Sequence, residues 1–144
     1  MSENIMGMYA QFKTDPEMEK SGIELEYRTG AKKPTIIRIA RAGGGNSKYQ
    51  RVLDIKGKPY RRQIQTETIA PEMLEALMRE VYADAVVLGW EDMTGPDGEI
   101  IPFTRENVIK VFTDLPDLFA DVQASANKVA LFRKQILEDD AKNS

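Results

Sequence analysis

Apolar positions recur with the period of strands near the start of the chain. From Ile23 to Tyr27 they alternate with polar positions, which places three apolar side chains on one face. A β-branched run, residues 35–41, follows Pro34 and predicts a second strand. The two strands predict a β-hairpin over residues 22–41. An isolated hairpin is marginal in water, so its apolar face should pack on the helices that follow.

Further along the chain the apolar residues recur with the period of helices. Pro71 and Pro116 suit first turns of helices, and Thr104 suits an N-cap. Apolar positions after each of these residues return at steps of three or four. The fold class predicted is α+β, mostly α, with an N-terminal β-hairpin followed by a small bundle of four or five helices. The predicted helices span about residues 46–57, 59–65, 71–88, 104–114 and 116–138.

A length of 144 residues fits one domain, which we place at residues 21–138. Residues 1–20 have no sustained period, and Asp15-Pro16 disfavours a helix across that point, so we predict a flexible arm. Residues 139–144 should form a frayed tail.

The composition narrows the possible chemistry. The chain has no histidine and no cysteine, which excludes ordinary zinc sites and serine or cysteine triads. We therefore expect no enzyme activity, no catalytic residue, no cofactor and no bound metal. No segment approaches the length of about 20 apolar residues that spans a bilayer.

The net charge of −3 hides a basic segment. Residues 28–62 hold eleven lysines and arginines against the single acid Asp54. These cations could pair with acidic helices of the same chain, bind an acidic partner, or bind nucleic acid with help from Tyr49 and Tyr60. The loop of three glycines at 43–45 precedes a helix, but it lacks the spacing of phosphate-binding motifs and is interpreted as a linker.

Aromatic and aliphatic residues in the last predicted helix form a stripe that a small interior has little room to bury. Exposed apolar patches of this kind mark interaction sites. We therefore predict a protein-binding surface on this helix, made by Phe119, Val122, Val129, Phe132 and Ile136.

The order of motifs between residues 88 and 132 is similar to that in the tail assembly chaperones of long-tailed bacteriophages. The residues that carry the resemblance are Leu88-Gly89-Trp90-Glu91, Pro102-Phe103-Thr104, Asn107-Val108, Asp114-Leu115-Pro116, Leu118-Phe119 and Leu131-Phe132-Arg133.

This resemblance implies a cytoplasmic protein of the infected host bacterium. Members of that family bind the tape-measure protein, keep it soluble, and help to recruit subunits of the major tail tube protein before they leave the finished virion. They are often also made as a longer, frameshifted form, which would be a further partner. Two alternatives stay open: a structural minor tail protein kept in the virion, and a small nucleic-acid-binding protein that uses residues 28–62.

Overall fold

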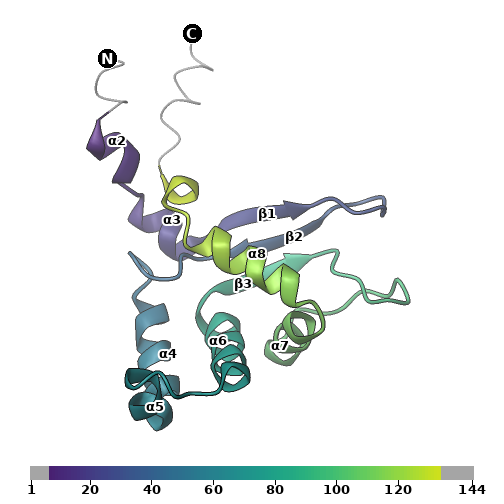
Figure 1. The fold of residues 1–144 in the computed structure, drawn as a ribbon. Helices are drawn as coiled ribbons and strands as arrows, with labels where there is room; N and C mark the ends of the chain where they lie inside the picture. The colour runs from purple at the N-terminus through teal and green to yellow at the C-terminus, as the bar shows by residue number, and fades with distance from the viewer. Residues whose placement is uncertain (1–6, 134–144) are drawn as a thin grey trace.

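The computed structural model describes residues 7–133, which form a three-stranded antiparallel sheet packed against helices (Figure 1). The sheet order is β1-β2-β3, and α8 crosses one face of it. The predicted fold class is confirmed. The elements in chain order are α2 (Met8–Phe12), α3 (Pro16–Ser21), β1 (Ile23–Tyr27), β2 (Thr35–Ile39), α4 (Ser47–Gly57), η1 (Lys58–Tyr60), α5 (Arg61–Gln65), α6 (Pro71–Ala85), β3 (Val87–Glu91), α7 (Arg105–Asp114), α8 (Pro116–Ala126) and η2 (Val129–Phe132).

The hairpin of β1 and β2 has the strands that the alternating pattern predicts. Leu25 pairs with Ile37 and Ile23 pairs with Ile39, so apolar residues of both strands lie on the same face. Ile37 and Ile39 are completely buried in the core. The opposite face carries Glu24 beside Arg38, as the two-residue period of strands requires.

The third strand corrects the sequence prediction. The helix predicted over residues 71–88 ends at Ala85, and residues 87–91 form β3, which pairs with β2 through Ile37 and Trp90. Two consecutive β-branched residues, Val86 and Val87, favour the change to extended structure. Gly89 lies inside the strand, opposite Arg38.

The core lies between the sheet and the helices α6, α7 and α8. Tyr82 packs edge-on against Phe119, with ring centroids 5.3 Å apart, and Phe112 stacks on Phe119 at 4.9 Å. All three side chains are at most 2% exposed. Aromatic pairs in these geometries stabilise the contact beyond the apolar area that they bury.

Part of the flexible arm predicted over residues 1–20 is helical, at residues 8–12 and 16–21, and its first six residues lie outside the described residues. Asp15 caps α3 by accepting a hydrogen bond from the backbone N–H of Glu17 (3.0 Å), and Pro16 opens the helix. The Asp15 N–H in turn donates to the Phe132 carbonyl at 2.7 Å. A contact more than a hundred residues away along the sequence, which no local pattern shows, therefore fixes this segment.

The long C-terminal helix predicted over residues 116–138 is interrupted in the structure; residues 134–138 of that prediction, and the predicted tail at 139–144, lie outside the described residues. The helix α8 ends at Ala126, and the short 3-10 helix η2 follows. The Asn127 side chain donates to the Gln123 carbonyl at 2.8 Å, an alternative to the helical backbone bond. The chain then turns, which brings Phe132 into a fully buried position.

The other predicted helices agree with the structure. The segment 46–57 corresponds to α4, 59–65 to the end of η1 and α5, and 104–114 to α7. The Thr104 hydroxyl accepts a hydrogen bond from the Asn107 N–H at 3.1 Å, which confirms the predicted N-cap of α7.

Candidate protein-binding surfaces

The residues predicted to form a protein-binding surface are mostly core residues. Phe119 is 2% exposed, and Val122 and Phe132 are fully buried. Val129 is half-buried, and Ile136 lies outside the described residues. The three buried side chains therefore belong to the interior of the chain: Phe119 and Val122 lie in the core cluster, and Phe132 lies in η2, which contacts α2 and α3.

Exposed apolar side chains lie elsewhere on the molecule. Three of them are on α2, and others lie on α4, α5 and the first turn of α6. The sequence prediction missed them because single apolar residues on a polar face do not produce a periodic pattern. The large apolar residues that are at least one-third exposed are Met8, Tyr9, Phe12, Ile55, Ile64, Met73, Leu74, Leu88, Ile100, Phe103, Leu115 and Leu131.

The first surface is on α2. Met8, Tyr9 and Phe12 are 70%, 83% and 61% exposed. Among the described residues, these three and Lys13 line a hollow of about 510 Å³. The helix contacts η2, and the guanidinium of Arg133, the residue after η2, donates to the Ala10 carbonyl at 3.5 Å.

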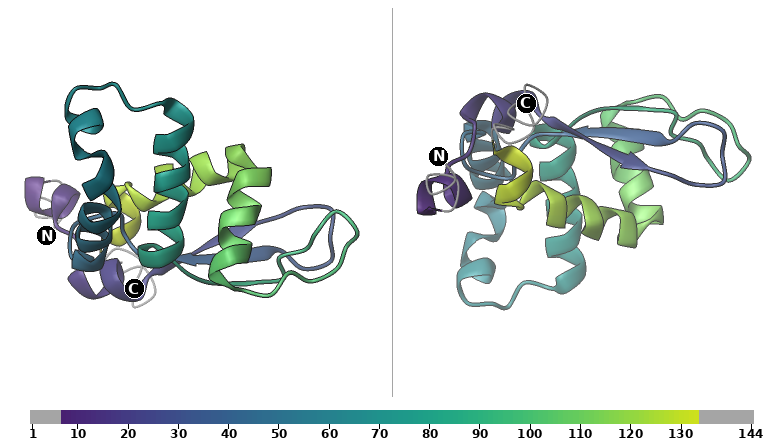
Figure 2. Two further views of the ribbon diagram at one scale, coloured as in Figure 1. Left: turned by 90° about the horizontal axis from the view of Figure 1, so that it is seen from below. Right: turned by 90° about the horizontal axis from the view of Figure 1, so that it is seen from above.

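The second surface is on the helical lobe, our name for α4, η1 and α5, which projects away from the sheet (Figures 1 and 2). Its inner side packs on α6. Tyr49 meets Tyr82 edge-on at 6.2 Å, and the Lys56 ammonium lies 3.3 Å from Glu80 and 3.7 Å from Asp84. α4 has no fully buried residue, so the lobe rests on half-buried contacts and ion pairs.

The outer side of the lobe carries what we call the cationic stripe: Lys48, Arg51, Ile55 and Lys58. These positions recur at steps of three, four and three, so successive helical turns place them on one line. All four side chains are exposed, and Ile55 is 71% exposed. Arg61 and Arg62 follow in α5, also exposed. The stripe therefore presents an aliphatic side chain among cations.

The structure partly bears out pairing of the basic segment with acids of the same chain. Arg28 pairs with Glu26 at 2.7 Å, Arg41 pairs with Glu19, and Lys56 pairs with α6. The cations of the stripe, together with Arg61 and Arg62, form no ion pair with any carboxylate in the described part of the chain.

The glycine loop has a structural role, as its interpretation as a linker requires. Gly44 has a φ of 55°, and a Cβ there would come within 2.6 Å of the Arg41 guanidinium. Arg41 is the partner of Glu19, which is only 2% exposed. Asn46, directly before α4, makes no capping bond, and its amide instead donates to the carbonyls of Arg41 and Ala85 at 2.8 and 2.9 Å. The loop thus closes over a buried polar cluster that joins α3, β2 and α6.

The residues around Trp90 that carry the resemblance to tail assembly chaperones also have structural roles. The Trp90 indole N–H donates to the Ile101 carbonyl at 2.9 Å, and its ring packs edge-on against Phe103 at 5.3 Å. The Asn107 amide donates to the Pro102 carbonyl at 2.9 Å. These bonds fix the loop 92–104 against β3 and set the start of α7.

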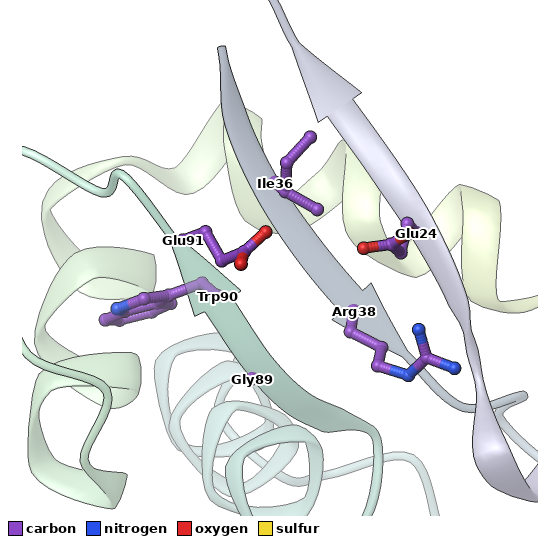
Figure 3. Close-up of a pocket in the computed structure, with 6 residues that line it drawn as sticks. All are labelled: Glu24, Ile36, Arg38, Gly89, Trp90 and Glu91. Carbon is purple, nitrogen blue, oxygen red and sulfur yellow. The ribbon is translucent and has the colours of Figure 1, made fainter. Parts of the chain in front are cut away.

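A groove of about 240 Å³ lies on the outer face of the sheet (Figure 3). Gly89 lies opposite Arg38 and leaves a gap in the row of side chains, with nothing within 4 Å of the position that a Cβ would take. The rim is mixed, with Glu24, Ile36 and Glu91. The Arg38 guanidinium donates to the Ser21 carbonyl at 2.9 Å, so this side chain is bonded to the end of α3.

Three partly or fully buried tyrosines have raised pKa values, and one of them joins a strand to a helix. The Tyr27 hydroxyl donates to the Asp121 carboxylate at 2.6 Å, which ties β1 to α8. Burial, and then this hydrogen bond, raise the pKa of Tyr27 above its ordinary value. Burial likewise raises the pKa of Tyr82 and of Tyr49.

Two features are absent from residues 7–133. No group of three or more side chains of the kinds that bind metals comes together there. None of the helices in that range is both long enough and apolar enough to span a bilayer.

Comparison with known proteins places the chain in a phage family. The model of a family described as YdaY prophage protein matches residues 44–143, which is most of the sequence. The chain belongs to this prophage protein family, and is therefore of phage origin. The match includes the helical lobe, β3 and α6 to η2, and it begins after β1 and β2. No curated protein and no solved structure gave a match.

Proposed function

We propose that this prophage protein is a tail assembly chaperone that binds the tape-measure protein, keeps it soluble, and helps to recruit subunits of the major tail tube protein. The observation that carries the proposal is the apolar surface left exposed on α2 and the helical lobe around a complete core. The phage family and the motif order after residue 88 support it.

The physical reason for such a chaperone lies in its client. A tape-measure protein exposes long apolar stripes until the tail tube encloses it, and such stripes promote aggregation. Many small proteins that each bind moderately tightly can cover one long filament. Mixed surfaces, with isolated apolar residues among charges, suit binding that must later be reversed.

We further propose that the chain acts in the cytoplasm of the host bacterium and is absent from the finished virion. A longer, frameshifted form would share residues 7–133 and their surfaces. The rival proposal is a minor tail protein, which would remain in the virion. It therefore predicts that purified virions contain this chain. Mass spectrometry of purified virions separates the two, because a retained subunit gives peptides of this chain in proportion to the tube protein.

The test of chaperone activity is co-expression. The tape-measure protein encoded by the same prophage is produced with and without this chain, and the soluble fraction is measured after centrifugation. We expect the soluble fraction to rise several-fold when the chain is present. An unchanged soluble fraction, with both proteins well expressed, would refute the proposal.

A further inference from the structure

We infer that the cationic stripe of the helical lobe is a docking site for an acidic amphipathic helix of a partner protein. The identity of that partner as the tape-measure protein rests on the proposed function. The preference of the site for an acidic helix is independent of that function, since it follows from the residues of the lobe.

The stripe has the geometry of one side of a helix pair. Lys48, Arg51, Ile55 and Lys58 lie within eleven residues, and the ten steps between the first and the last span about 15 Å at the helical rise. Their steps of three and four match the spacing with which side chains of one helix meet those of another. The opposite side of α4 is already used, because Tyr49 and Lys56 contact α6.

The charge of the lobe selects an acidic partner. Residues 47–65 hold six lysines and arginines and one acid, Asp54, in a chain whose net charge is −3. The Asp54 carboxylate accepts a hydrogen bond from the Gln50 amide at 2.8 Å, which occupies the one acid of the lobe. Glutamates of an incoming helix would thus meet the cations of the stripe, Lys48, Arg51 and Lys58, which form no ion pair with a carboxylate among the described residues.

Ile55 favours a protein over a nucleic acid. Its side chain is 71% exposed in the middle of the stripe, one turn from the cations on either side. A phosphate backbone offers nothing apolar for this side chain to contact, whereas an amphipathic helix places a leucine or isoleucine between its acids. Binding should therefore lose affinity both when cations are removed and when Ile55 is made polar.

The experiment measures binding of a labelled helical peptide of about 21 residues, with glutamates beside a leucine seam at heptad spacing, to the full chain by fluorescence anisotropy. The comparison probes are the same peptide with lysine in place of each glutamate and a DNA duplex of about 20 base pairs. We expect the acidic peptide to bind, and the basic peptide not to bind.

Two variants of the stripe, each with a matched control, locate the site; in the first comparison both the variant and its control carry a pair of substitutions. Lys48→Gln with Arg51→Gln removes two cations of the stripe, and Lys32→Gln with Lys33→Gln removes two exposed cations of the β1–β2 turn. We expect the first pair to weaken acidic-peptide binding at least about threefold and the second pair to leave it nearly unchanged. Likewise, Ile55→Ser should weaken binding about threefold or more, whereas Ile100→Ser, at a position that is 61% exposed, should not.

Three results would overturn the inference: no binding of the acidic peptide, equal losses in the stripe and control variants, or tight DNA binding that Ile55→Ser leaves unchanged. The last would favour a nucleic-acid site. These outcomes are separate from the test of the proposed function. If the chain binds the acidic peptide through the stripe but does not solubilise the tape-measure protein, the docking site is supported and the proposed function is refuted. If the Lys48→Gln, Arg51→Gln variant solubilises the tape-measure protein as well as the original chain does, the proposed function is supported and the client binds elsewhere.

Discussion

At the scale of single residues, the buried polar cluster under the glycine loop explains why the loop has glycine where it does. Gly44 adopts a left-handed φ of 55° directly over the Arg41 side chain. Only glycine meets both requirements without strain or displacement of a neighbour. Removing a partner from a buried ion pair such as Glu19 with Arg41 is strongly destabilising, so the loop and the pair depend on each other.

Gly44→Ala should lower the free energy of unfolding by about 1–3 kcal/mol, from backbone strain and displacement of Arg41. Urea denaturation followed by circular dichroism measures the change. Gly30→Ala is the control, because nothing lies within 4 Å of the position that a Cβ would take there and its φ is not left-handed. Equal stability of both variants would show that the contact with the cluster is unimportant.

The hydrogen bond of Tyr27 to Asp121 predicts a loss of stability at alkaline pH. The pKa of Tyr27 is raised in the folded chain, so its contribution to stability is complete below the ordinary tyrosine pKa of about 10 and is lost as the pH rises through the folded value. Tyr27→Phe should cost about 1 kcal/mol at neutral pH and should make stability fall less between about pH 9 and about pH 11. Urea denaturation of both proteins over this range measures it, and parallel pH curves would contradict the assignment.

At the scale of elements, the local sequence predicts those structures whose signals lie within one segment. The alternation in β1, the proline that opens α6 and the threonine before α7 all gave elements that the structure confirms. The strand β3 was missed because residues 86–88 continue the helical period, and only pairing with β2 decides their structure. The end of α8 and the helices before β1 were missed for the same reason, since the contact between Asp15 and Phe132 is not local.

The cap of α7 provides a direct test at this scale. Thr104→Ala removes the side-chain oxygen that accepts from the Asn107 N–H, and should lower the free energy of unfolding by about 1 kcal/mol. Thr104→Ser keeps an acceptor and should retain most of the stability. Thermal unfolding compares the three proteins, and an alanine variant as stable as the serine variant would show that the cap does not hold the helix.

At the scale of the whole molecule, the structure buries most of the side chains that the sequence predicted as a protein-binding surface. Surplus apolar surface exists, but on α2 and the helical lobe. Both Phe119 and Phe132 are buried by non-local contacts: Phe119 packs on Tyr82 and Phe112, and Phe132 lies in η2, which contacts α2 and α3. Ile55 was missed because its environment on α4 is polar. Some cations of the basic segment pair with acids of the chain, and others have no ion pair among residues 7–133. The sequence alone could not assign Lys56 to α6 or Lys48 to solvent.

These contacts divide the molecule into a well-buried core and a helical lobe with few buried residues. The sheet with α6, α7 and α8 forms the rigid core, and the helical lobe is attached to it by half-buried contacts and ion pairs. Elements with few buried residues open locally at low free energy, so binding of a partner there should be visible as increased protection.

The most direct measurement is amide hydrogen exchange, followed by mass spectrometry, of this chain alone and in its complex with the tape-measure protein. We predict slowed exchange across residues 47–65 in the complex, with little change across the β1–β2 hairpin at residues 23–39. A stable complex in which the hairpin is protected and the helical lobe exchanges as in the free chain would contradict the proposed docking site, and the absence of any complex would contradict the proposed function.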